Sequence, residues 1–119
     1  MNVLLTGSSG FLGSAIEQVL MKSSWINLSV SLRTAKTEFH TGKQHIVGEI
    51  NGFTDWASAL WEQDVVIHAA ARAHAMSGYL QKSLMEYRRV NVEGTINLAR
   101  QSAAVGVRRF IFISSIKVN

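Results

Sequence analysis

The segment that most constrains the fold of this chain is residues 3–13, VLLTGSSGFLG, near the N-terminus. An apolar, strand-like run leads into glycines at positions 7, 10 and 13. In such a unit the first glycine permits a sharp turn, the second leaves the backbone open to a pyrophosphate, and the third lets the helix pack closely on the strand. Ser14 stands where a Walker-type phosphate loop has its lysine, which excludes that motif. We therefore predict a strand, a phosphate-binding turn and a helix.

The rest of the chain alternates strand-like and helix-like segments. A first helix is expected to end near residues 22–24, and Gly94 is expected to interrupt a long helix that ends at Gly106. Thr54 is the expected N-cap of a short helix. These elements predict the α/β class, a doubly wound parallel sheet of strand order 3-2-1-4-5 with right-handed crossovers. The expected strands are 28–32, 44–47, 64–69 and 107–114, and the later helices are 55–61 and 79–104.

Composition excludes several classes of protein. The length of 119 residues allows one compact domain, and an apolar share of 47% suits a globular core. There is no cysteine, the histidines lack metal-ligand spacing, and the +4 net charge comes from scattered arginines, so we expect no metal site and no nucleic-acid surface. The longest apolar run, 65–71, is too short to span a membrane. Because a strand begins almost at once, we expect no signal peptide and a cytoplasmic location.

Four motifs, in order, resemble those of extended short-chain dehydrogenase/reductases over the whole chain. They are Thr6-Gly7-x-x-Gly10-x-x-Gly13, His68-Ala69-Ala70-Ala71, Asn91-Val92-x-Gly94-Thr95 and Ser114-Ser115. Within that family, segments 66–74 and 112–119 look most like bacterial nucleotide-sugar epimerases. These are UDP-glucose 4-epimerase-like enzymes of the NAD-dependent epimerase/dehydratase family, which act in surface-polysaccharide pathways.

The resemblance implies a Rossmann-type fold with a bound NAD. It assigns cofactor contacts to three groups of residues: Gly7, Gly10, Phe11, Leu12 and Gly13 at the pyrophosphate, Glu49 and Ile50 at adenine, and Ala69, Ala70 and Ala71 at the ribose and nicotinamide. Asn91 would support the active site, and Ser115 would bond the substrate hydroxyl that is oxidised. From the residues alone, Ser115 could instead end a strand, and Asn91 could tie its helix to a neighbouring strand. His68 is expected to be a packed core histidine rather than a proton shuttle.

Arg33 departs from the usual NAD pattern. An acidic residue about 20 positions after the glycines normally bonds the ribose 2′-hydroxyl, and here Leu32 and Arg33 occupy that place. The cation could accept the 2′-phosphate of NADP, or stack on adenine in an NAD enzyme. Both readings stay open from the sequence.

The 119 residues hold no Tyr-x-x-x-Lys pair, since Ser83 follows Tyr79 and Asn91 follows Tyr87 at that spacing. We therefore expect residues 1–119 to be the N-terminal dinucleotide-binding half of a nucleotide-sugar epimerase, without a substrate-binding lobe and inactive alone. A full-length parent would oxidise and reduce a sugar C4 through bound NAD. An NADPH-dependent reductase or dehydrogenase of the same superfamily and a non-catalytic dinucleotide sensor remain alternatives. The open edge of the last strand predicts a homodimer or other association.

Overall fold

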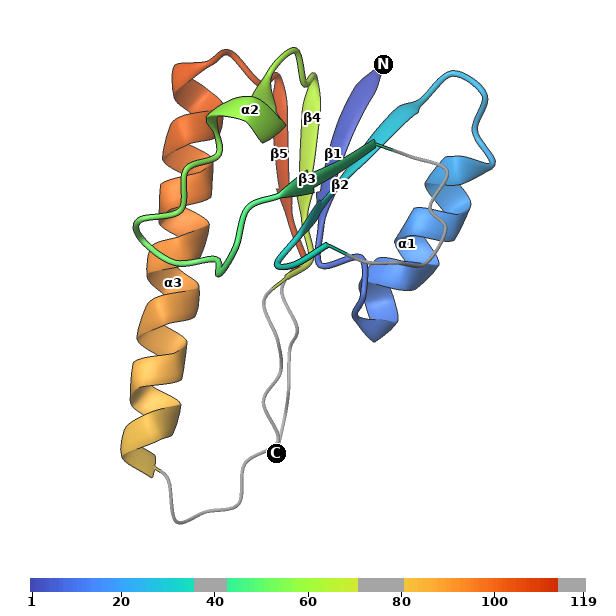
Figure 1. Cartoon of the computed structure of the whole chain (residues 1–119). Coiled ribbons are helices and arrows are strands. Elements are labelled where there is room, and N and C mark those ends of the chain that lie inside the picture. The colour runs from blue at the N-terminus through green and yellow to red at the C-terminus, as the bar shows by residue number, and fades with distance from the viewer. Residues whose placement is uncertain (36–42, 71–80, 114–119) are drawn as a thin grey trace.

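The computed structural model describes residues 1–35, 43–70 and 81–113 (Figure 1). In chain order the elements alternate as the sequence predicts, with two strands in succession after the first helix. Their bounds are β1 (Asn2–Thr6), α1 (Phe11–Met21), β2 (Asn27–Leu32), β3 (Lys43–Ile46), α2 (Ala57–Leu60), β4 (Val65–His68), α3 (Gln81–Ala104) and β5 (Arg109–Phe112).

All five strands form one parallel sheet in the order β3-β2-β1-β4-β5, which confirms the predicted topology. The central strand β1 pairs with β2 on one side and with β4 on the other. The chain therefore winds away from β1 in both directions. In such sheets a crevice opens where the winding reverses, at the carboxyl ends of the central strands.

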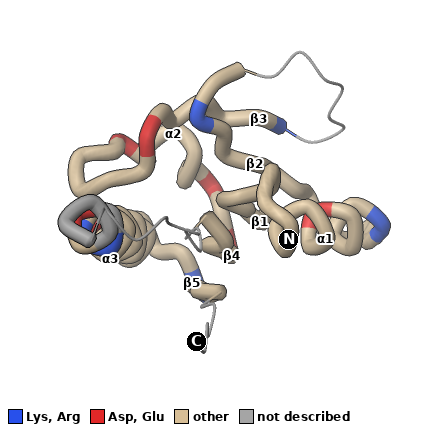
Figure 2. Tube along the Cα trace, turned by 90° about the horizontal axis from the view of Figure 1, so that it is seen from below, with Lys and Arg blue, Asp and Glu red and all other residues tan. Residues whose placement is uncertain are grey.

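Helices cover both faces of the sheet, with α1 on one side and α2 and α3 on the other (Figure 2). Alternate residues of each strand supply the two cores, because successive side chains point to opposite faces. On the α1 face, Val3 and Leu5 pack with β2 and β4, and Ile16 and Leu20 of α1 cover them. On the other face, Leu4 packs in a buried cluster with Trp56, Ala59, Leu60, Val66 and Leu98.

The C-terminal end of α3 follows the sequence closely. Gly106 has a positive φ of 84° and its N–H donates to the carbonyl of Ala103, while the Val107 N–H donates to Ser102. This is the Schellman arrangement that glycine favours at the end of a helix. The prediction that Gly106 ends the helix is confirmed.

Two other helix predictions are wrong. The short helix spans only Ala57–Leu60 and its N-cap is Trp56; the Thr54 hydroxyl instead donates to the Glu49 carbonyl and accepts from the Asn51 N–H. Gly94 does not interrupt the long helix, because α3 runs unbroken from Gln81 to Ala104. A single glycine lowers helix propensity by about 1 kcal/mol, which packing along so long a helix readily offsets. In the described part of the chain, no helix is long and apolar enough to cross a membrane.

Candidate functional site

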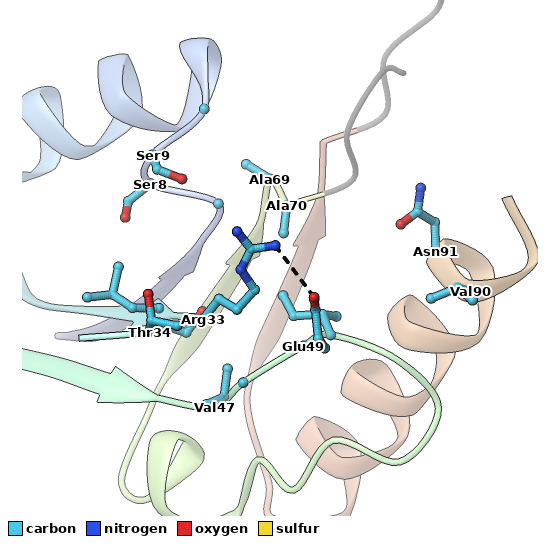
Figure 3. Close-up of a pocket in the computed structure, with 16 residues that line it drawn as sticks. Ser8, Ser9, Arg33, Thr34, Val47, Glu49, Ala69, Ala70, Val90 and Asn91 are labelled. Carbon is cyan, nitrogen blue, oxygen red and sulfur yellow. Dashed lines mark hydrogen bonds and ion pairs between the residues drawn. The ribbon is translucent and has the colours of Figure 1, made fainter. Parts of the chain in front are cut away.

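A pocket of about 310 Å³ opens at the carboxyl ends of the strands, and most of the predicted cofactor residues line it (Figure 3). Its walls come from the glycine-rich turn after β1, the end of β2, the segment after β3, the end of β4 and one turn of α3. The predicted residues that meet there are Gly7, Gly10, Arg33, Glu49, Ile50, Ala69, Ala70 and Asn91. Segments far apart in the sequence thus converge on one site.

The three glycines of the turn serve different purposes. Gly7 has φ 79°, and a Cβ there would lie 2.5 Å from the carbonyl carbon and oxygen of Ala69. A Cβ on Gly13 would lie 1.8 Å from the Gly7 carbonyl oxygen, so this glycine packs the helix against the turn rather than against the strand. A Cβ on Gly10 would meet only that oxygen, at 3.4 Å. Gly10 is thus the position where a side chain would fit the protein but occupy pocket space.

The first turn of α1, beside the pocket, presents backbone donors that have no hydrogen-bond partner among the described residues. The first intrahelical bond runs from the Ser14 N–H to the Gly10 carbonyl at 2.9 Å, so the amides of Phe11, Leu12 and Gly13 precede the helical ladder. Gly10 caps the helix without a side-chain hydrogen bond. The amides and the positive end of the helix dipole are suited to an anionic ligand such as a pyrophosphate.

Two serines that line the pocket have buried hydroxyls without a hydrogen-bond partner within the described residues. Ser8 is 4% exposed and Ser31 is 5% exposed. A buried hydroxyl without a partner costs about 1–3 kcal/mol, so both groups are poised to bond a polar ligand. Sequence reasoning missed both. The available signal was the alternation of serines with apolar residues in β2, which places Ser31 two residues before Arg33.

Arg33 and Glu49 face each other across the pocket mouth. Arg33 Nη1 lies 3.5 Å from Glu49 Oε1, and the two side chains are 58% and 68% exposed. Figure 3 shows this ion pair as the dashed line between the end of β2 and the segment after β3. The sequence predicted separate cofactor contacts for the two residues, and the structure shows that they also form an ion pair with each other.

The segment that carries Glu49 and Ile50 is held in place by α3. Asn97 Nδ2 and Gln101 Nε2 donate to the Thr54 carbonyl at 2.9 and 2.8 Å. Gly94 provides the space for the segment, since a Cβ there would lie 3.0 Å from Ile50 Cγ2 and 3.2 Å from its carbonyl oxygen. The physical role of Gly94 is therefore close approach of this segment. The sequence signal was a glycine and two amides on successive turns of one helix.

His68 is 2% exposed and hydrogen-bonded through both ring nitrogens, which confirms the prediction of a packed core histidine. Nδ1 lies 2.6 Å from Thr6 Oγ1, and Nε2 lies 3.0 Å from Thr95 Oγ1. Because the N–H of Ala69, a pocket-lining residue, donates to the same Thr6 hydroxyl, this network ties β1, β4 and α3 together next to the pocket. Burial lowers the pKa of His68 from 6.5 to about 4, so the imidazole is neutral at pH 7.

The predicted catalytic residues are only partly within the described structure. Asn91 lies half-buried in the pocket wall on α3, beside Val90. Ser115 and Ala71 lie outside the described residues, so their roles stay predictions. Among the residues that the structure describes, no cluster of three or more histidines and carboxylates is placed to hold a metal ion.

Comparison with known proteins gives consistent matches. A model of the "NAD dependent epimerase/dehydratase family" matches residues 3–118. A UDP-glucose 4-epimerase from Vibrio cholerae is 44% identical over 99% of this chain and 36% of its own length. A 3-beta-hydroxysteroid dehydrogenase from Mycolicibacterium neoaurum is 33% identical over 95% of this chain and 31% of its own.

Among solved structures, a UDP-glucuronic acid 4-epimerase from Bacillus cereus superposes with a TM-score of 0.79. It is 27% identical, and the match covers 99% of this chain and 41% of the epimerase, which was crystallised with UDP-glucuronic acid and NAD. The chain thus spans about a third of the length of the curated relatives that it matches.

Proposed function

This chain belongs to the NAD-dependent epimerase/dehydratase family, and on that premise we propose that it forms the NAD-binding part of a nucleotide-sugar epimerase. The observation that carries the proposal is the pocket itself, which is lined by the glycine-rich turn and by two serines without a partner among the described residues, and which lies beside the first turn of α1. A dinucleotide fits these groups because its pyrophosphate needs backbone donors and its riboses need polar partners.

Each wall of the pocket has a role in this proposal. The amides of Phe11, Leu12 and Gly13 bind the pyrophosphate, and the absence of a side chain at Gly10 leaves room for it. Ile50 lies against adenine, and the small Ala69 and Ala70 allow close approach of the nicotinamide half. A bound nicotinamide supplies a hydride acceptor. The protein's contribution here is to bind and orient it.

The proposed substrate is a UDP-sugar. It rests on the 44% identity to the Vibrio cholerae UDP-glucose 4-epimerase and on the UDP-glucuronic acid bound in the Bacillus cereus structure. In the proposal Asn91 supports the reacting sugar and Ser115 bonds the hydroxyl that is oxidised. Because neither tyrosine in the 119 residues has a lysine four positions on, we propose that this chain binds cofactor without completing a turnover.

A second candidate is a hydroxysteroid dehydrogenase-like activity, favoured by the 33% identity to the Mycolicibacterium neoaurum enzyme. The higher identity to the epimerase over a larger share of this chain favours the first reading. Both activities use the same dinucleotide pocket, and net consumption of NAD(H) would distinguish the dehydrogenase.

Calorimetric titration with NAD⁺, comparing the chain with its Gly10→Val variant, tests the binding function. A Cβ at Gly10 meets only one protein atom, at 3.4 Å, and the valine side chain would fill the space proposed for the pyrophosphate. We expect NAD⁺ to bind the unmodified chain and the variant to lose at least about tenfold in affinity while keeping its circular dichroism spectrum. Equal binding by the two proteins would refute the proposed pocket.

A further inference from the structure

The pairing of Arg33 with Glu49 bears on which dinucleotide the pocket accepts. We propose that Glu49 is the residue that selects a cofactor with a free ribose 2′-hydroxyl over one with a 2′-phosphate, by occupying the guanidinium of Arg33. This inference rests on the proposed dinucleotide-binding function. The choice between the two dinucleotides then depends on Glu49, after β3, and not on Arg33 alone.

The location of the pair follows from the fold. Arg33 comes 20 residues after Gly13, at the end of β2, where dinucleotide-binding folds contact the ribose 2′ position. Glu49 approaches the same point from the end of the neighbouring strand β3, with 3.5 Å between Nη1 and Oε1. A group on the 2′ carbon would therefore meet both charges.

The backbone of Glu49 is fixed although its side chain is exposed. Its carbonyl accepts a 2.7 Å hydrogen bond from the Thr54 hydroxyl, and the Thr54 carbonyl is bound in turn by Asn97 and Gln101. The next residue, Ile50, packs against Gly94. These contacts fix the backbone that carries the carboxylate, so pairing with Arg33 costs side-chain entropy but little backbone entropy.

The charges then favour the hydroxyl. A 2′-hydroxyl can donate a hydrogen bond to the Glu49 carboxylate while Arg33 stays paired. A 2′-phosphate carries up to two negative charges at neutral pH and has no proton to donate, so it repels Glu49 and must compete with it for Arg33. Two unit charges about 4 Å apart in water interact strongly enough to change affinity by about fivefold.

Titrations with NAD⁺ and NADP⁺, which differ only in the 2′-phosphate, test the inference on the 119-residue chain. We expect the unmodified chain to bind NAD⁺ more tightly. Glu49→Gln should reduce the ratio of NAD⁺ affinity to NADP⁺ affinity by about five- to tenfold. The main cause should be stronger NADP⁺ binding, because the variant removes the repulsion between the carboxylate and the 2′-phosphate and frees Arg33. Added salt should reduce the NADP⁺ affinity that Glu49→Gln gains, because the new ion pair between Arg33 and the 2′-phosphate is exposed to solvent. Arg33→Gln, in contrast, should bind NADP⁺ more weakly than the unmodified chain does.

Glu62→Gln is the matched control. It makes the same change in net charge just before β4, at the amino ends of the strands and away from the pocket, and should leave the ratio of NAD⁺ to NADP⁺ affinity unchanged. Equal affinities for the two dinucleotides in the unmodified chain, or a ratio that Glu49→Gln does not change, would overturn the inference while leaving the binding function intact. Failure to bind either dinucleotide would overturn the proposed function itself, and this inference with it.

Discussion

The buried histidine at the end of β4 predicts a pH-dependent loss of stability. His68 has a pKa of about 4 in the folded chain against 6.5 for the unperturbed group, because burial penalises its charged form. Between these values the unfolded chain binds a proton on this imidazole and the folded chain does not. Stability is therefore complete above pH 6.5, falls as the pH is lowered toward 4, and levels off below that. The whole effect amounts to about 3 kcal/mol.

The assay is urea denaturation, followed by circular dichroism between pH 7 and pH 4, on the unmodified chain and on His68→Gln. Glutamine keeps a donor and an acceptor near Thr6 and Thr95 but does not titrate. The variant will be less stable at pH 7, since it repacks a buried site. The informative quantity is the difference between the two stabilities at each pH, in which groups common to both proteins cancel.

We expect that difference to shrink by about 2–3 kcal/mol from pH 7 to pH 4. His45→Gln serves as the control. Burial and the neighbouring Lys43 also lower the pKa of His45, but this side chain is only half-buried, so its effect has the same sign and a smaller size. A constant difference between the unmodified chain and His68→Gln over this pH range would refute the account of His68.

Three further predictions concern the fold and the pocket. Gly13→Ala should destabilise the chain by about 1–3 kcal/mol in urea, because its Cβ collides with the Gly7 carbonyl; Gly10→Ala, its control, should cost less than about 1 kcal/mol. Ser31→Ala should leave the free chain at least as stable yet weaken NAD⁺ about three- to tenfold by calorimetry; unchanged affinity would remove Ser31 from the site. Concentration-dependent association is expected because β5 is an edge strand of the sheet that the described residues form, and a monomer at high concentration by sedimentation would contradict it.

The sequence allowed the sheet to be predicted because its signals are local. Runs such as 65–67 are apolar and β-branched, as in strands that are covered on both faces, and Gly106 lies where a helix needs a left-handed residue to end. Strand order then followed from the alternation of strands and helices with right-handed crossovers. The purpose of Gly7 was also predictable, since a turn directly after a strand restricts the backbone conformation.

The remaining features depend on contacts between distant segments. The sequence around Gly94 suggests a weak point in a helix, and only the fold brings Ile50 against it. Thr54 resembles an N-cap in the local sequence, but its hydroxyl donates to the Glu49 carbonyl and accepts from the Asn51 N–H. This bonding pattern has no strong sequence signal. The partnership of Arg33 and Glu49 likewise requires knowing that β2 and β3 are neighbours.

The central claim is that the glycine-rich turn and the first turn of α1 bind the pyrophosphate of NAD. Amide-resolved ¹H–¹⁵N NMR spectra of the chain, recorded during titration with NAD⁺, test it most directly. We predict the largest shifts at the amides of Phe11, Leu12 and Gly13, with smaller ones at Ser31 and Ala69. Shifts confined to the amino ends of the strands, or no shifts at saturating NAD⁺, would contradict the claim.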